Sequence, residues 1–173
     1  AEVCRDQSWG VNIPLFYHSV EKQIELCEKN KAPVIITSAG NPKQFTARLK
    51  SKGIKVIHVV SSLKFALKAQ DAGVDAVVAE GFEAGGHNGR EETTTLCLLE
   101  SLYGQLDIPV IAAGGIATGR AMAAAFCLGA EGIQVGSRFA AATESSAHKV
   151  FKQAVVNAKE GDTKLTLKEL TPV

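Results

Sequence analysis

The 173-residue sequence predicts an α/β fold, a partial (β/α)8 barrel formed by a single domain over residues 1–173. Apolar runs typical of buried parallel strands alternate with amphipathic stretches typical of helices. These βα units are regular in length except for one longer unit. Regular units fit either a barrel or an open doubly wound sheet. No G-x-G-x-x-G motif follows the first strand, which disfavours the dinucleotide-binding open sheet and leaves the barrel.

Six apolar segments, rich in Val, Ile and Ala, are the predicted strands. They are apolar throughout rather than alternating, which is typical of strands covered on both faces. The strands lie at residues 9–16, 33–39, 54–61, 76–81, 109–115 and 132–139, and a weaker run at 163–167 is a candidate seventh strand.

Amphipathic segments between the strands are the predicted helices. Asn41 is a predicted N-cap because Pro42 follows at the first helical position, and Gly53 is typical of a residue that ends a helix. One further predicted helix starts at Val20, and the others lie at residues 63–73, 93–105, 119–128 and 147–159. In the helix at 93–105, the inward-facing residues are expected to be Leu96, Leu99 and Leu102. The helix at 147–159 carries an apolar stripe of Val150, Phe151, Ala154, Val155 and Ala158.

Composition excludes several classes of function. The 19 basic and 18 acidic side chains nearly cancel and form no basic stripe, so we expect no nucleic-acid partner. No apolar run approaches the ~20 residues of a membrane span. The four cysteines lie far apart without a C-x-x-C pair, and no signal-like leader is present, so we expect a cytoplasmic protein without a membrane partner. No His, Cys, Asp and Glu set has metal-ligand spacing, so we expect no metal.

The longer unit places extra residues at 82–92, directly after the fourth predicted strand. In a barrel this is the carboxyl face, where active sites are built. Gly85, Gly86 and Gly89 surround His87 there, and glycines let a backbone approach a flat ligand closely. The sequence therefore predicts that His87 presents a catalytic imidazole at the barrel mouth. The alternative is a solvated histidine in a flexible loop.

Two successive predicted strands end in glycines. Gly114 and Gly115 end the fifth strand, and Gly136 with Ser137 ends the sixth. The loops after the last strands of such barrels are the usual phosphate site, and bare backbone amides with a hydroxyl suit a phosphate. These four residues are the predicted phosphate cradle, and tight turns alone are the alternative.

Two polar side chains interrupt otherwise apolar strands. Asn12 is expected to be a buried amide that bonds either a ligand ring or the neighbouring loops, and the sequence leaves both possibilities open. His58 lies among Val and Ile, and a core histidine with satisfied ring nitrogens is the favoured interpretation.

The segment 79–87, Ala-Glu-Gly-Phe-Glu-Ala-Gly-Gly-His, resembles the signature of nitronate monooxygenases, also called 2-nitropropane dioxygenases. Flavin-dependent enoyl-acyl-carrier-protein reductases share the barrel and a similar loop. The resemblance implies an FMN-binding (β/α)8 barrel. It implies that Asn12 contacts the flavin ring, that Gly114, Gly115, Gly136 and Ser137 hold the flavin phosphate, with Ser137 in place of a more usual Thr, and that His87 is the catalytic base or binds substrate.

The resemblance implies a small-molecule substrate, either a nitronate or an enoyl thioester. The first expectation is oxidation of alkyl nitronates or nitroalkanes with FMN and O₂. The alternatives are NADH-dependent reduction of an enoyl-acyl carrier protein and a truncated, non-catalytic flavin-binding barrel. Glu80 stands where many nitronate monooxygenases have Gln, which favours the reductase pattern at that position.

Members of the resembled family begin with another strand and end with a helical segment, and both are expected to be missing here. Ala1 is not an initiator methionine, so we expect the chain to be part of a longer polypeptide. The alternative is a homo-oligomer in which a second copy closes the barrel, because all strands are needed for closure.

Overall fold

The computed structural model describes residues 8–166 and contains one six-stranded sheet in the order β1-β2-β3-β4-β5-β6. Every neighbouring pair is parallel. The strands are β1 (Gly10–Pro14), β2 (Val34–Ser38), β3 (Lys55–Val60), β4 (Ala76–Glu80), β5 (Val110–Ala113) and β6 (Gly132–Gln134). The strands lie side by side in the order of the sequence, as in the wall of a barrel, whereas a doubly wound sheet reverses its strand order. The predicted barrel is therefore confirmed over the doubly wound sheet.

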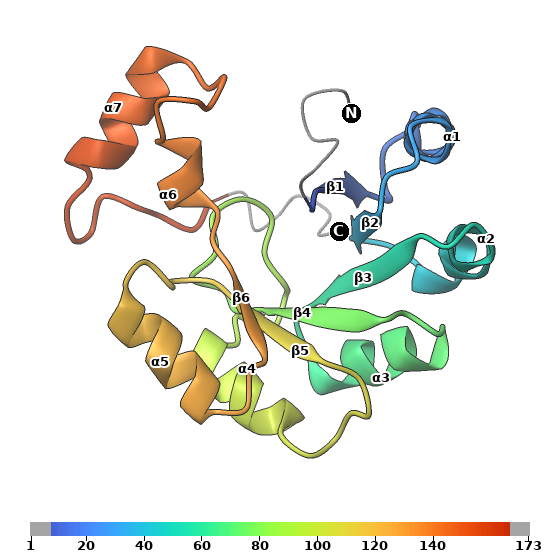
Figure 1. Cartoon of the computed structure of the whole chain (residues 1–173). Coiled ribbons are helices and arrows are strands. Elements are labelled where there is room, and N and C mark those ends of the chain that lie inside the picture. Colours follow the sequence, from blue (N-terminus) through green and yellow to red (C-terminus); the bar gives the residue numbers. More distant parts are fainter. Residues whose placement is uncertain (1–7, 167–173) are drawn as a thin grey trace.

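Helices follow the strands and cover the outer face of the curled sheet (Figure 1). They are α1 (Val20–Lys29), the short 3₁₀ turn η2 (Pro42–Gln44), α2 (Thr46–Ser51), α3 (Leu63–Asp71), α4 (Thr95–Leu102) and α5 (Gly119–Cys127). Two more, α6 (Ser137–Ala140) and α7 (Lys149–Asn157), lie beyond the end of β6. Within residues 8–166, β1 and β6 do not pair with each other, so the sheet forms an open half-barrel.

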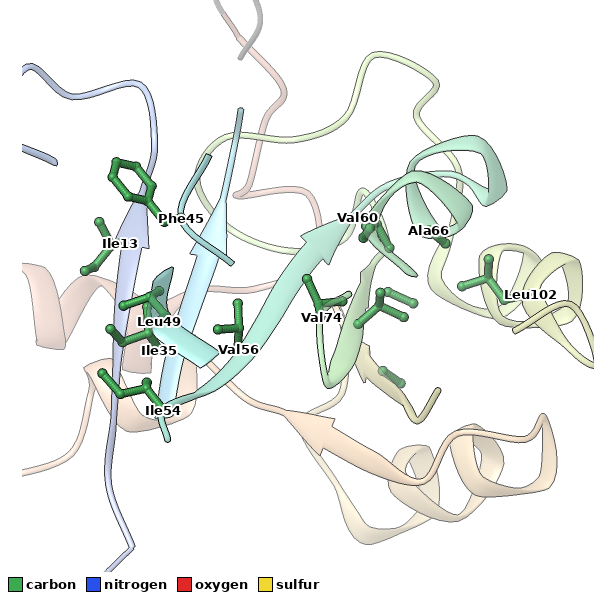
Figure 2. Close-up of a cluster of buried hydrophobic side chains, with 14 of the residues drawn as sticks. Ile13, Ile35, Phe45, Leu49, Ile54, Val56, Val60, Ala66, Val74 and Leu102 are labelled. Atoms are coloured by element: carbon green, nitrogen blue, oxygen red, sulfur yellow. The ribbon is translucent and has the colours of Figure 1, made fainter. Parts of the chain in front are cut away.

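The hydrophobic core lies between the outer face of the sheet and these helices (Figure 2). Ile13 and Ile35 from the first two strands pack with Leu49 of α2, and all three side chains are essentially inaccessible. Burial of apolar area at about 25 cal/mol per Å² is the main stabilising term for such a layer. The core therefore holds the strand ends in fixed positions.

The predicted helix signals are confirmed where a cap defines them. Asn41 accepts a hydrogen bond from the Lys43 amide at 3.2 Å, with Pro42 first in η2. Gly53 ends the following segment with φ of +75°, a backbone conformation that favours glycine.

The predicted inward face of the fourth helix is partly wrong. Leu96 is 51% exposed, and Leu98 is buried in its place beside Leu99 and Leu102. The helix begins at Thr95, and burial follows the spacing i, i+3, i+4, i+7 from that residue. The sequence prediction failed because it left a polar threonine out of the buried stripe.

Three predictions for the C-terminal third need correction. The sixth strand ends at Gln134, and Ser137 begins α6, so the predicted strand to residue 139 is too long. Residues 163–166 form no strand, and residue 167 lies outside the described residues. The predicted apolar stripe of α7 is not buried, since Val150 is 71% and Phe151 is 53% exposed. The described residues provide no second layer against that stripe.

Candidate active site

A cavity of about 440 Å³ lies at the edge of the sheet where the parallel strands end. The loop between β4 and α4 forms one side of it, and residues from the ends of β1, β2 and β3 form the other. The side chains that matter most for chemistry in this cavity are Asn12, Phe16, Tyr17, Ser38, Glu80, His87 and Gln134. The carboxyl edge is where active sites of such barrels are built.

His87 lines this cavity from the loop after β4, with an exposed imidazole. Its ring centroid lies 5.6 Å from that of Phe16, and Phe16 in turn lies 4.2 Å from Tyr17. These aromatic residues follow β1 and give the imidazole an apolar neighbour across the cavity. Phe16 and Tyr17 were not among the predicted site residues, although two consecutive aromatic residues after a strand end are a usable signal.

The His87 loop is held by hydrogen bonds of its own. The Asn88 side-chain amide donates to the carbonyl oxygens of Phe82 at 2.9 Å and Ala84 at 3.0 Å. Gly89 packs so closely on the end of β3 that a Cβ there would lie 2.4 Å from the Cβ of Ser61. Asn88 and Gly89 thus fix the backbone on the C-terminal side of His87.

On the N-terminal side, the loop is anchored by Glu83. Its carboxylate accepts hydrogen bonds from the backbone amide of Thr95, at 2.9 and 3.2 Å, and from the Thr95 hydroxyl at 3.0 Å. A carboxylate at this place also complements the positive end of α4. The Thr95 hydroxyl lies 2.9 Å from the Gly114 carbonyl oxygen, so one buried side chain touches both the loop and the end of β5.

Gly114 and Gly115 form a tight turn under this loop, with φ of +105° and +67°. A Cβ on Gly114 would lie 2.7 Å from the Thr95 hydroxyl, and one on Gly115 would lie 3.3 Å from the Cβ of Glu83. Local packing therefore requires glycine at both positions, whatever else their amides bind.

Gly136 differs, because its backbone does not require glycine. Its φ is −99°, and a Cβ there would meet no atom within 4 Å. The neighbouring Ser137 faces the His87 loop, since a Cβ on Gly85 would lie 3.7 Å from the Ser137 hydroxyl oxygen. The space beside Gly136 is open to a ligand, and Ser137 could contribute a hydroxyl to it.

Polar side chains also line the concave face of the sheet. The strand register aligns Glu80 with Ala113 and Ala113 with Gln134, so the three residues share one face. Burial raises the pKa of the Glu80 carboxyl above its ordinary value. Asn12 lines the same cavity, but the expectation that it is buried is wrong, since it lies on the open concave face and is exposed.

His58 is the core histidine that the sequence indicated. It is 5% exposed, and its Nδ1 lies 2.7 Å from the Thr37 hydroxyl oxygen on the neighbouring strand. Burial, with a smaller contribution from the Lys68 ammonium, lowers its pKa to about 4. The imidazole is therefore neutral at neutral pH and packs as part of the structure.

The structure brings together only part of the predicted set in one cavity. Asn12 and His87 line the cavity, while Gly114 and Gly115 pack beneath the His87 loop. Gly136 and Ser137 adjoin the same loop from β6. Within residues 8–166, no group of three or more His, Cys, Asp or Glu side chains could hold a metal ion. No helix in the described part of the chain is long and apolar enough to cross a membrane.

A curled parallel half-barrel sheet with outer helices matches part of a (β/α)8 barrel, and the structural neighbours are TIM-barrel flavoenzymes. The sequence model of the family described as nitronate monooxygenase matches residues 2–169. The chain belongs to this family.

Several proteins are similar to this chain. Probable nitronate monooxygenases from Staphylococcus saprophyticus and Staphylococcus aureus strain Newman are each 38% identical, over 83% of this chain and 43% of theirs. The structure of FabK from Thermotoga maritima is 48% identical with a TM-score of 0.88, covering 93% of this chain and 51% of that chain. A nitroalkane oxidase from Streptomyces ansochromogenes is 31% identical with a TM-score of 0.69, covering 78% and 42%. The chain thus spans less than half the length of its curated relatives.

Proposed function

We propose that this chain is the flavin-binding, His-bearing half of an FMN-dependent oxidoreductase that reduces enoyl thioesters with NADH. The single observation that carries this choice is the greater likeness to FabK, an enoyl-acyl-carrier-protein reductase, than to the nitroalkane oxidase. Glu80, a carboxyl where many nitronate monooxygenases have an amide, supports the same choice. The sequence alone ranked nitronate oxidation first, and the likeness to FabK is our reason for reversing that order.

The cavity and its edge fit FMN. Gly136 leaves open space beside a hydroxyl, as a phosphate site needs, and Asn12 lies on the concave face where a flat ring would rest. We assign the phosphate to Gly114, Gly115, Gly136 and Ser137, and the ring to Asn12. FMN, when bound, supplies the electron transfer, and the protein supplies position and electrostatics. FMN rather than FAD fits a site with one phosphate cradle and no adenine-binding fingerprint.

His87 is the proposed proton-transfer residue. In reduction of an enoyl thioester, a ring nitrogen of His87 would deliver a proton to the substrate carbon next to the carbonyl. Phe16 would give that imidazole an apolar contact on the other side of the cavity. Asn88 and Glu83 would hold the loop so that the imidazole stays over the cavity.

Nitronate oxidation is the second candidate, and the 38% identical relatives, which are probable nitronate monooxygenases, favour it. When the substrate enters as the neutral nitroalkane, a ring nitrogen of His87 would accept the proton α to the nitro group and so form the nitronate. The same imidazole could serve either reaction, because one needs a proton delivered to the carbon next to the thioester carbonyl and the other needs a proton removed from the carbon next to the nitro group of a neutral nitroalkane.

Anaerobic reduction of the bound flavin separates the two candidates. We expect NADH at low concentration to bleach the flavin quickly, and a nitronate to bleach it slowly or not at all. Fast bleaching by the nitronate with no response to NADH would reverse the order of the candidates. The flavin released by heat should run as FMN on chromatography, and FAD would contradict the assigned cofactor.

A further inference from the structure

We propose that Thr95 and Glu83 are positioning residues that set the His87 loop and the phosphate cradle in one fixed relation. This inference rests on the FMN site proposed above. Thr95 is the first residue of α4, and it is 3% exposed. Its hydroxyl contacts both Glu83, in the loop that carries His87, and Gly114, which is 19 residues further along the chain.

The Thr95 hydroxyl is surrounded by acceptors. Its oxygen lies 3.0 Å from a Glu83 carboxylate oxygen, 2.9 Å from the Gly114 carbonyl and 3.2 Å from the Ala113 carbonyl. A hydroxyl has one proton, so these three oxygens share a single donor. The hydroxyl therefore links the loop that carries His87 to the end of β5. Its removal would take the hydroxyl donor from the Gly114 carbonyl, whereas the Ala113 carbonyl keeps the Gly81 amide and Glu83 keeps the Thr95 amide.

Two glycines pack against the Thr95 hydroxyl and leave it no room to move. A Cβ on Gly81, at the end of β4, would lie 2.1 Å from the Thr95 hydroxyl oxygen, and one on Gly114 would lie 2.7 Å from it. Two strand ends thus close around one oxygen atom. A change in its size or bonding must displace the end of β4, where the His87 loop begins, or the turn of the cradle.

Glu83 also packs against the phosphate cradle, beside Gly115. Its carboxylate holds the Thr95 amide and hydroxyl, while its Cβ lies where a side chain on Gly115 would make a tight contact of 3.3 Å. A small misplacement of a catalytic group can slow a reaction by orders of magnitude. Thr95 and Glu83 therefore affect flavin binding and turnover together, without touching substrate.

The test compares Thr95→Val with Thr46→Val in the full protein. Thr46 is a matched control, because it is also the first residue of a helix, is 2% exposed, and donates its hydroxyl to one carbonyl oxygen, that of Pro42. Both variants should lose thermal stability to a similar degree. Only Thr95→Val should bind FMN about tenfold more weakly, the scale of a lost hydrogen bond. It should also move the phosphorus-31 resonance of the bound FMN phosphate, a readout that general destabilisation does not change.

Two further variants keep the test decisive if Thr95→Val does not fold. Thr95→Ser keeps the hydroxyl, so its FMN affinity should stay near that of the wild type. Glu83→Ala removes the carboxylate from the loop, and should lower kcat more than it raises KM while shifting the same phosphorus resonance. Wild-type affinity and an unshifted resonance in Glu83→Ala would overturn the inference. If the wild-type protein itself does not bind FMN, the proposed function and this inference both fail.

Discussion

The polar groups at the amino ends of the strands and those at the carboxyl ends have opposite roles. Where the strands begin, charges are paired: the Glu28 carboxylate accepts from Arg48 at 2.8 Å and from Lys52 at 2.9 Å, which lowers its pKa to about 2. Asp75 likewise pairs with Lys55 at 3.0 Å and accepts from the Val56 amide at 2.9 Å. This edge has little left to offer a ligand.

Where the strands end, polar groups are held in place but left available. Burial raises the pKa of Glu80, and the Gly136 backbone faces open space. The scaffold beneath is hydrogen-bonded, through Glu83 with Thr95 and through Asn88. At the amino ends of the strands, paired charges stabilise the fold. At the carboxyl ends, hydrogen bonds instead position groups that are free to react.

The largest expected effect lies at the carboxyl edge. His87→Ala should keep FMN but lower turnover by about 10²–10⁴-fold, the usual effect of removing a general acid or base. His148→Ala, at the start of α7, is the control and should leave turnover unchanged. If the substrate proves to be a nitroalkane, activity on the pre-ionised nitronate should fall much less than on the neutral form. Unchanged steady-state rates in His87→Ala would remove the residue from the site.

Acid stability gives the next largest effect, because His58 is buried and neutral near the same edge. Its pKa is about 4 in the folded protein against an ordinary 6.5, so the unfolded chain binds the proton first. The contribution of neutral His58 to the free energy of unfolding is fully present above pH 6.5. It is lost as the pH falls toward 4, and the total loss is about 3 kcal/mol. Urea unfolding at pH 7 and pH 4.5 measures this loss. His58→Gln should show a smaller loss, and an equal loss in both proteins would contradict the assignment.

A smaller effect is expected where the strands begin. Arg48→Met should lower the free energy of unfolding by less than the acid-induced loss at His58, because it leaves Glu28 with one cation instead of two and removes the Arg48 partner of Glu21 in a solvent-screened setting. FMN affinity should not change. Lys43→Met, at an exposed lysine without an ion pair in the described part of the chain, should change stability by less than about 0.5 kcal/mol. Loss of flavin from Arg48→Met would show that the two edges are not independent.

The repeating pattern of the sequence was enough to predict the barrel wall. Apolar strands at regular intervals predicted all six strands, and Asn41 with Gly53 bounded a helical segment correctly. The end of β6 could not be predicted this way. Apolar residues continue to Phe139, but the chain turns into α6 at Ser137, and short apolar runs do not distinguish a strand from a helix.

The sequence indicated which residues form the candidate site, but it did not indicate which of them contact one another. The cluster of glycines around His87, placed directly after a predicted strand, located the loop, since clustered glycines cost conformational entropy and are typical of close backbone approach to a ligand. The link between Glu83 and Thr95 spans an irregular loop, where no periodicity relates the two residues. Phe16 meets His87 only because the carboxyl ends of separate strands converge, a contact that depends on the tertiary fold.

The central claim is that the edge near Gly136 binds a flavin phosphate, and a fluorescence titration tests it most directly. FMN and riboflavin, which lacks the phosphate, are titrated into flavin-free wild-type protein, Gly136→Asp and Gly136→Ala. We predict that wild-type protein prefers FMN to riboflavin. Gly136→Asp should lose that preference, because its carboxylate repels the phosphate. Gly136→Ala should fold normally, because its Cβ meets no protein atom. Equal binding of FMN and riboflavin by wild-type protein, or unchanged FMN affinity in Gly136→Asp, would contradict the account.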